Sequence, residues 1–135
     1  MNKQLFELSV PFPINQIHWV NKGKGGELAH LNARDVMKRL DDVVGGENWK
    51  DEIIYSGNTA ICNLSVRIND EWITKSDASG ETNFEAEKGA SSTAFKRAAV
   101  KFGVGRYLYY LPNSANRNNI PSWATPDGYR EKKAA

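Results

Sequence analysis

The residues best suited to binding chemistry are basic side chains interleaved with aromatic ones in the second half of the chain. Residues 88–106 carry five basic residues and no acid, and among them are Lys96, Arg97, Lys101 and Arg106. At about 100° per residue in a helix, Arg97 and Lys101 fall within roughly 40° of each other, and Lys96 lies roughly 100° around from Arg97. Such a surface suits a single nucleic-acid strand, whose phosphates pair with cations while bases stack on rings. The alternative, from charge alone, is a solvated face whose cations complement the helix dipole.

A long helix is the element that has to position these cations. Thr82 is a good N-cap, and Glu85 three residues later completes a capping box. Gly103 ends the helix, because glycine readily adopts the left-handed conformation that follows a helix C-terminus. A narrow apolar stripe recurs at helical spacing, which predicts packing on a sheet. Its members are Phe84, Ser91, Phe95, Ala98 and Phe102. We interpret Tyr109 and Tyr110, beyond the glycine, as core residues of a second short helix rather than as stacking platforms for bases.

Residue types that perform catalysis are present but are not arranged for it. The glycine-rich segment 23–26 lacks the spacing and the following Ser or Thr of a P-loop. His18 and His30, on neighbouring predicted strands, do not form a usual zinc set with the single cysteine, Cys62, which we place in the core. Adjacent carboxylates are better explained as solvated turns than as a two-metal nuclease centre. They lie at 41–42, 51–52 and 70–71. We therefore expect a protein that is not an enzyme and has no metal and no cofactor.

Composition and charge agree with one soluble domain. The chain has 135 residues, of which 25% are charged and 40% hydrophobic, with a formal net charge of +2. The charge is segregated, because residues 69–87 carry six acids against one base and the next nineteen carry only bases. No apolar run approaches the roughly eighteen residues of a membrane span, and the first residues do not form a signal peptide. With one cysteine, a reducing compartment is expected, and the cytosol is the default location.

The first half of the chain predicts an arm, a hairpin and a helix. Residues 1–13 are predicted to be an extended arm because prolines bracket Phe12. Residues 14–20 and 28–31 are predicted to pair as a hairpin across a Gly/Lys turn. A helix follows from N-cap Asn32 to the Gly45–Gly46 pair. Its predicted core side is Val36, Met37, Leu40, Val43 and Val44, and its predicted exposed ion pairs are Asp35–Arg39 and Lys38–Asp42.

Residues 49–76 predict a three-stranded antiparallel meander covered by the long helix, and the fold class is α+β. Segment 59–68 alternates cleanly between apolar and polar residues, with shorter strands predicted at 51–56 and 71–76. A polar loop is expected at 77–81. The Pro- and Asn-rich tail, 112–135, is expected to be extended, with Trp123 as its anchor.

Several separated motifs resemble one protein family. The segment AFKRAAVKFGVGRYLYYLP at 94–112 closely resembles the signature helix of phage single-strand annealing proteins in the Rad fifty-two superfamily of recombination mediators. LNARDVMKRLDDVVGGENWKDE at 31–52 resembles the first helix and following strand of the same family. Segments 11–19 and 120–126 are similar to its phage branch. The resemblance spans about residues 10–126, with the motifs in the family's order.

The resemblance implies a β-β-β-α core that assembles side by side into a homo-oligomeric ring with a basic groove for single-stranded DNA. The groove contacts that it implies are Lys96 and Arg97 from the signature helix, with Lys101, Arg106, and either Lys22 or Lys24. The two hairpin lysines are included because Val20 stands where eukaryotic members have a groove arginine. Thr93 is a second departure, since many relatives have an acid there. The long C-terminal extension of larger relatives is absent from this sequence.

The function that these observations predict is ATP-independent annealing of complementary DNA strands in homologous recombination and repair. Phosphates would lie in the basic groove with bases exposed for pairing, and residues 1–111 would form the annealing domain. A single-strand-binding protein or an exonuclease of the phage or host is the expected kind of protein partner, with no membrane involved. Three alternatives stay open: a protective or loading factor for single-stranded DNA that does not anneal, a small metal-dependent nuclease, and a purely structural ring. The scarcity of aromatic residues off the predicted core faces favours exposed bases.

Overall fold

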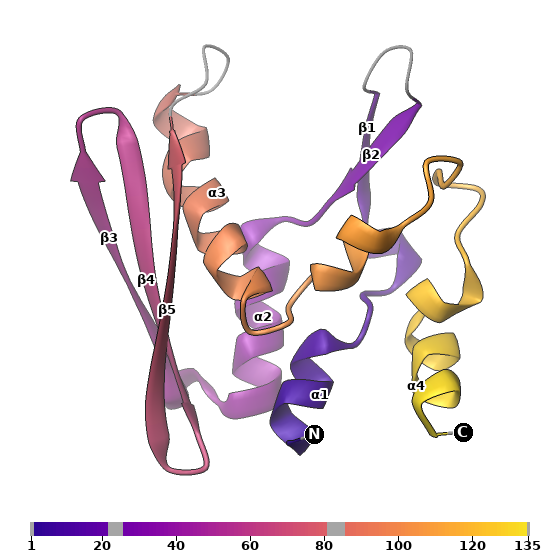
Figure 1. Cartoon of the computed structure of the whole chain (residues 1–135), viewed down its shortest axis with the longest axis horizontal. Helices are drawn as coiled ribbons and strands as arrows, with labels where there is room; N and C mark the ends of the chain where they lie inside the picture. The colour runs from indigo at the N-terminus through magenta and orange to yellow at the C-terminus, as the bar shows by residue number, and fades with distance from the viewer. Residues whose placement is uncertain (1, 22–25, 81–85, 135) are drawn as a thin grey trace.

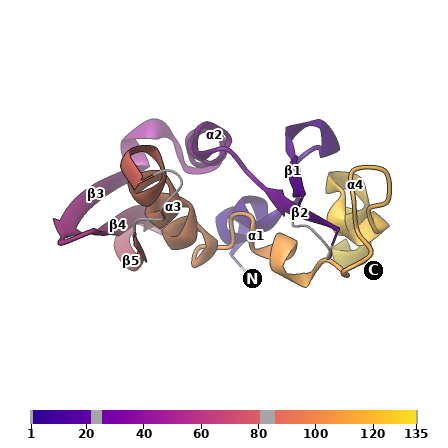
Figure 2. The ribbon, with the colours of Figure 1, turned by 90° about the horizontal axis from the view of Figure 1, so that it is seen from above.

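The computed structural model describes residues 2–21, 26–80 and 86–134 and has an α+β fold. Four α-helices accompany a two-stranded and a three-stranded antiparallel sheet among these residues. The larger sheet, with α2 and α3 against it, occupies one end of the molecule, and the small hairpin and α4 occupy the other (Figures 1 and 2). The helices are α1 (Lys3–Ser9), α2 (Ala33–Val44), α3 (Ala86–Val100) and α4 (Pro126–Ala134). The strands are β1 (His18–Asn21), β2 (Glu27–His30), β3 (Trp49–Ser56), β4 (Thr59–Ile68) and β5 (Glu71–Gly80).

The predicted meander is confirmed, with strand order β3-β4-β5. Strand β4 alternates as expected, so that its apolar residues face α3 while the opposite side chains face away from it. The residues on the side of α3 are Ala60, Cys62, Leu64, Val66 and Ile68, all buried. Asn69 and Asp70 make the tight turn between β4 and β5, at φ values of 53° and 63°, which these two residue types tolerate. Burial raises the pKa of the Cys62 thiol to about 11, which agrees with a core residue.

Helix α3 covers this sheet with the stripe expected from its sequence. Phe95, Ala98 and Phe102 are buried, and the Phe95 ring lies 5.9 Å from that of Trp49 on β3. The helix ends before Gly103, whose φ of 103° is the conformation that only glycine adopts without strain. The predicted capping box at Thr82 and Glu85, and Phe84, lie outside the described residues.

Strand β5 is longer than predicted, since the polar loop expected at 77–81 is strand up to Gly80. Asp77 and Ala78 pair with Cys62 and Ile61 of β4. Strand β4 has ten residues, and extending β5 along it satisfies backbone hydrogen-bonding groups that a loop would leave to solvent.

The predicted extended arm is wrong, because residues 3–9 form α1. The side-chain oxygen of Asn2 accepts hydrogen bonds from the amides of Gln4 and Leu5, at 2.7 and 3.1 Å, and caps the helix. The helix ends before Pro11, which disfavours a helical conformation at Val10. The predicted strand at 14–20 begins only at His18, after a 3₁₀ turn at Ile14–Gln16.

Helix α2 has the predicted bounds but a different set of contacts. Lys38 and Asp42 form the expected ion pair, at 2.6 Å. The predicted Asp35–Arg39 pair is not formed. Arg39 is directed inward, where its guanidinium donates to the carbonyls of Glu7, Leu8 and Val10 at 3.3, 3.1 and 2.6 Å. These carbonyls belong to the end of α1, where backbone acceptors have no partner within the helix. Met37, predicted in the core, is exposed.

The predicted extended tail is also wrong, because it contains α4 after a short 3₁₀ turn at Ser122–Ala124. Thr125 caps α4 by accepting from the Gly128 amide at 3.1 Å, and Pro126 occupies the first helical position, where proline is favoured. Trp123 is partly buried against the core, as expected of an anchor. Helix α4 packs on α1 through the rings of Tyr129 and Phe6, 5.6 Å apart.

Within the described residues, no helix combines the length and the apolar character needed to cross a membrane.

Candidate nucleic-acid interface

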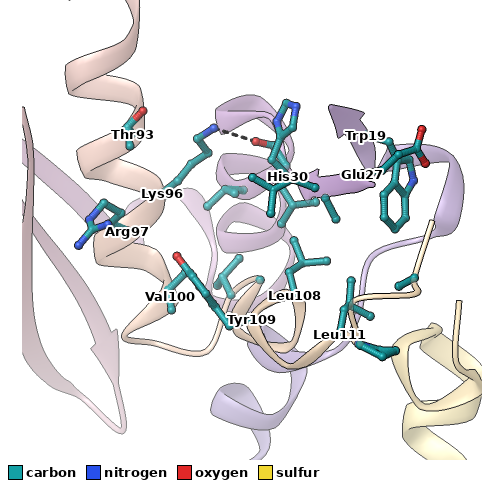
Figure 3. Close-up of a pocket in the computed structure, with 18 of the residues that line it drawn as sticks. Trp19, Glu27, His30, Thr93, Lys96, Arg97, Val100, Leu108, Tyr109 and Leu111 are labelled. Carbon is teal, nitrogen blue, oxygen red and sulfur yellow. Dashed lines mark hydrogen bonds between the residues drawn. The ribbon is translucent and has the colours of Figure 1, made fainter. Parts of the chain in front are cut away.

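A cleft of about 500 Å³ opens between α3 and the β1–β2 hairpin (Figure 3). Lys96, Arg97 and Val100 line it from α3, while Trp19, Ala29 and His30 line it from the hairpin. The segment after α3, including the 3₁₀ helix Arg106–Tyr110, completes it with mostly apolar side chains. Gly105 permits this arrangement, since it has a φ of 75° and a Cβ there would lie 2.9 Å from Leu31. The cleft therefore combines an apolar lining with cations from one helix.

Lys96 crosses the cleft from α3 to the hairpin side. Its Nζ donates a hydrogen bond to the Leu31 carbonyl at 3.0 Å, and the side chain is partly buried (Figure 3). Burial lowers the pKa of Lys96 from its ordinary value. The lysine thus joins α3 to the end of β2 and brings a positive charge to the cleft.

Arg97 faces the sheet side of α3 and meets an acid there. Its Nε lies 3.3 Å from Oδ1 of Asp77 on β5, and Nζ of Lys101 lies 3.8 Å from Oδ2. Burial alone would raise the pKa of Asp77, but the Ala78 amide, Arg97 and Lys101 outweigh it and hold the pKa below its ordinary value. The carboxylate is therefore charged at neutral pH. It pairs with Arg97 and Lys101, the same cations that a bound phosphate would contact.

The remaining predicted cations lie around the C-terminal end of α3. Arg106 donates to the carbonyls of Val100 and Lys101 at 3.1 and 2.9 Å, which satisfies acceptors that the helix leaves free. Neither Lys101 nor Arg106 lines the cleft. The predicted cations therefore form two groups, one of Lys96 and Arg97 at the cleft and one of Lys101 and Arg106 at the end of α3. Lys22 and Lys24 lie outside the described residues.

Sequence reasoning missed Lys75, which belongs to the group at the helix end. Its Nζ donates to the Lys101 carbonyl at 3.0 Å and lies 5.2 Å from the centre of the Phe102 ring. The signal was present in the alternation of β5, because Lys75 is two residues from the partly buried Ile73 and therefore faces α3.

The interpretation of Tyr109 and Tyr110 as core residues is wrong. Their side chains are 67% and 71% exposed, and Tyr109 also lines the cleft (Figure 3). The short helix is present, but Tyr107 is its buried tyrosine, and its hydroxyl oxygen accepts from the Phe12 amide at 3.0 Å. Burial raises the pKa of Tyr107 to about 12. A helix of five residues buries only one side, so two rings are left beside the basic residues.

The two histidines lie on neighbouring strands, as predicted. His18 and His30 are cross-strand partners whose rings stack 5.5 Å apart. His30 is partly buried and lines the cleft, a location that the sequence did not indicate. Among the residues that the structure describes, no three or more His, Cys, Asp or Glu side chains, including these two histidines, are grouped so that they could hold a metal ion.

An ion pair between Glu27 and Arg117 also holds the hairpin in place. Glu27 on β2 accepts from the guanidinium of Arg117 at 2.9 and 2.6 Å and from the Arg117 amide at 3.2 Å. These contacts join the hairpin to the segment that follows Leu111, which also lines the cleft. Both walls of the cleft are therefore fixed by polar contacts between segments distant in sequence.

Comparison with known proteins agrees with the motifs found in the sequence. Residues 56–123 match a family described as "Rad52/22 family double-strand break repair protein". The single-stranded DNA-binding protein DdrA of Deinococcus deserti is 33% identical over 147 residues, covering 95% of this chain and 73% of the relative. DdrA of Deinococcus radiodurans, with the same description, is 34% identical over 142 residues, covering 91% of this chain and 68% of the relative. The phage branch stays a prediction, but the chain belongs to the Rad52/22 family of double-strand break repair proteins.

Proposed function

We propose that this protein binds single-stranded DNA and anneals complementary strands without ATP, in homologous recombination and repair. The observation that carries the proposal is the set of cations on and after α3, which begins at the cleft with Lys96 and Arg97 and continues through Lys101 to Arg106. Relatives that align with nearly the whole chain are described as single-stranded DNA-binding proteins. Phosphate contacts of this kind supply affinity without reading sequence, as annealing of arbitrary strands requires.

Annealing follows if the cations hold phosphates and leave bases free to pair. A strand bound in this way is neutralised and extended, so that two bound strands repel each other less than free ones. Pairing is then downhill, since duplex stacking contributes about 1.4 kcal/mol per step. No nucleotide hydrolysis is needed for this mechanism. We propose Lys96, Arg97, Lys101 and Arg106 as the DNA contacts, with Lys22 or Lys24 as a further contact from the hairpin.

Assembly into a ring is part of the same proposal. The outer strands of the larger sheet, β3 and β5, each have one edge without a strand partner among the described residues. Such edges favour association with another copy. A ring would multiply weak phosphate contacts into tight, salt-sensitive binding. Light scattering measures the mass of the protein in solution, and a mass equal to one chain would refute the ring.

The test of annealing uses two complementary labelled oligonucleotides in a buffer that contains neither ATP nor magnesium. We expect the protein to accelerate duplex formation at low salt and to lose this effect at high salt. No acceleration despite tight binding would refute annealing and would leave a protective single-strand binder. No binding to either strand would refute the whole proposal.

The site assignment is tested by Lys96→Ala and Arg97→Ala, with Lys132→Ala as a charge-matched control. Lys132 is exposed on α4, which does not line the cleft. Each cleft variant should weaken DNA binding, and the slope of log affinity against log salt should fall by about 0.7 for each lost phosphate contact. The control should keep the wild-type slope. Equal slopes in all three variants would show that the strand lies elsewhere.

The second candidate is a protective factor that holds the bases as well as the phosphates. The exposed rings of Tyr109 and Tyr110 beside the cations favour it, since base stacking on an aromatic ring contributes about 1–3 kcal/mol per base. Double substitution of Tyr109→Ala and Tyr110→Ala separates the two functions. Weaker binding with faster annealing would indicate stacked bases, whereas unchanged binding would leave the bases free.

A further inference from the structure

His18 and His30 form a pair on one face of the hairpin, at the edge of the basic cleft. They are opposite each other in the β1–β2 register, and their rings lie 5.5 Å apart with planes 30° from parallel. His30 is partly buried and lines the cleft, whereas His18 is exposed. Figure 3 shows the His30 ring on the side of the hairpin that Lys96 reaches. A strand lying along α3 at Lys96 would therefore pass within reach of an imidazole.

The described strands of this hairpin have no permanent positive charge. Residues 18–21 and 26–30 contain neither lysine nor arginine. Their one acid, Glu27, alternates with His30 onto the opposite face and is bonded to Arg117. Protonation of the two imidazoles is thus the way in which these strands can gain a positive charge. The other wall of the cleft, in contrast, already carries Lys96.

The groups around His30 favour the neutral form of its ring in the free protein. Burial is the largest effect, and the positive charge of Lys96 and the neighbouring His18 act in the same direction, so that the pKa of His30 is lowered from its ordinary value of 6.5. Two acids are close enough to matter, and both are engaged elsewhere. Asp77 pairs with Arg97, and Glu27, which also lines the cleft, pairs with Arg117, so neither offsets these effects. An anion placed between Lys96 and the ring would reverse the balance.

We propose, resting on the function proposed above, that His30 with its stacked partner His18 contacts a phosphate of bound single-stranded DNA in the protonated form. Binding would then take up a proton from solution. Because only the bound state favours the charged ring, affinity should rise as pH falls through the histidine's bound-state pKa. Between the pKa of the histidine in the free protein and its pKa in the complex, uptake of one proton makes the dissociation constant fall about tenfold for each unit by which the pH is lowered.

The first measurement is the affinity for a thymidine oligonucleotide from about pH 8 to about pH 6 at constant ionic strength. Thymine has no group that titrates in this range, so the oligonucleotide adds no pH dependence of its own. The wild type should bind more tightly as the pH falls. His30→Gln should match the wild type at the alkaline end and show a nearly flat profile. His18→Gln should show a smaller loss, since its ring is the exposed partner.

A second variant distinguishes a phosphate contact from a structural role. His30→Lys places a permanent cation at the same position, and we expect tight binding that no longer depends on pH. A ring needed only for packing would give the opposite result, weaker binding at every pH. Circular dichroism melting of each variant checks that the fold is kept. The chain has only two histidines, so the double variant His18→Gln/His30→Gln serves as a histidine-free control.

The outcomes separate this inference from the function on which it rests. Binding whose pH dependence is the same in the wild type and the histidine-free variant would overturn the histidine contact and leave the annealing proposal intact. Absence of binding at every pH would overturn the proposed function itself. Wild-type binding that becomes weaker on acidification would also overturn the histidine contact, because such a pH dependence means that binding releases protons instead of taking them up.

Discussion

At the scale of single residues, Asp77 is the acid that competes with DNA for the proposed site. It engages Arg97 and Lys101 at 3.3 and 3.8 Å, and its lowered pKa keeps it ionised at neutral pH. A phosphate must displace these contacts before it can use either cation. If the strand binds at the proposed site, the carboxylate should reduce affinity while it holds both side chains in position.

We expect Asp77→Asn to bind single-stranded DNA more tightly than the wild type. An exposed ion pair contributes at most about 1 kcal/mol, so the gain should be about two- to fivefold. The salt dependence should become steeper, because more phosphate contacts form. Fluorescence anisotropy over a salt series measures both quantities. Weaker binding would mean that Asp77 positions the cations more than it competes for them. Asp70→Asn is the matched control, since Asp70 pairs with Arg67 in the β4–β5 turn.

At the scale of elements, the hairpin is the wall of the cleft that depends most on contacts with other segments. It has two short strands, and the two contacts described above, Lys96 with the Leu31 carbonyl and Glu27 with Arg117, attach it to the rest of the fold. An isolated two-stranded hairpin is marginally stable in water. Its position, and hence the width of the cleft, should respond to the loss of either contact.

We expect Glu27→Gln and Arg117→Ala both to weaken DNA binding by releasing the hairpin. The two substitutions change the net charge in opposite directions, so a purely electrostatic effect would strengthen binding in the first variant and weaken it in the second. Hydrogen exchange of the β2 amides should accelerate in both. Arg67→Ala, which breaks a similar exposed pair in the β4–β5 turn, is the control and should leave exchange in β2 unchanged.

The elements that sequence predicted well are those whose pattern is set by burial. Strand β4 and the stripe of α3 repeat at 2 and 3.6 residues because each buries one face, and this periodicity is visible without neighbours. Helices α1 and α4 are short, and both depend on contacts with other segments: Arg39 of α2 binds the end of α1, and Tyr129 of α4 packs on Phe6 of α1. The caps at Asn2 and Thr125 are signals that the sequence contains, but the prolines near them also favour an extended chain, so local pattern alone does not decide between the two. The exposure of Tyr109 and Tyr110 depends on which side of a short helix is covered, which only the tertiary structure decides.

At the scale of the whole molecule, the two ends of the chain pack together through α1 and α4 (Figure 1). Tyr129 of α4 shares a hydrogen bond of 3.0 Å with Ser9, and Arg130 makes two bonds of 2.8 Å to Glu7 on α1. Helix α1 is in turn held by Arg39 of α2. Helix α4 thus supports the core through α1 without lining the cleft.

We expect deletion of residues 126–135 to lower stability and to leave DNA binding unchanged below the melting temperature. Loss of the Phe6–Tyr129 ring contact alone should cost about 0.5–1.5 kcal/mol, measured by urea unfolding. Tyr129→Phe, which removes only the hydroxyl bond to Ser9, should cost less. Loss of binding in the folded deletion variant would place the tail within the annealing domain. The division after residue 111 stays a prediction until that result.

Because Cys62 is buried, a single cysteine added at the surface can be labelled with a fluorescent dye without first removing Cys62. It is the only cysteine, it lies beneath α3, and its pKa of about 11 leaves almost no thiolate at neutral pH, so maleimide reagents should ignore it in the folded protein. A cysteine introduced at an exposed position such as Ser122 would then be the one reactive thiol. Energy transfer between dyes on separate copies would report how far apart neighbouring subunits lie, without any change to the core.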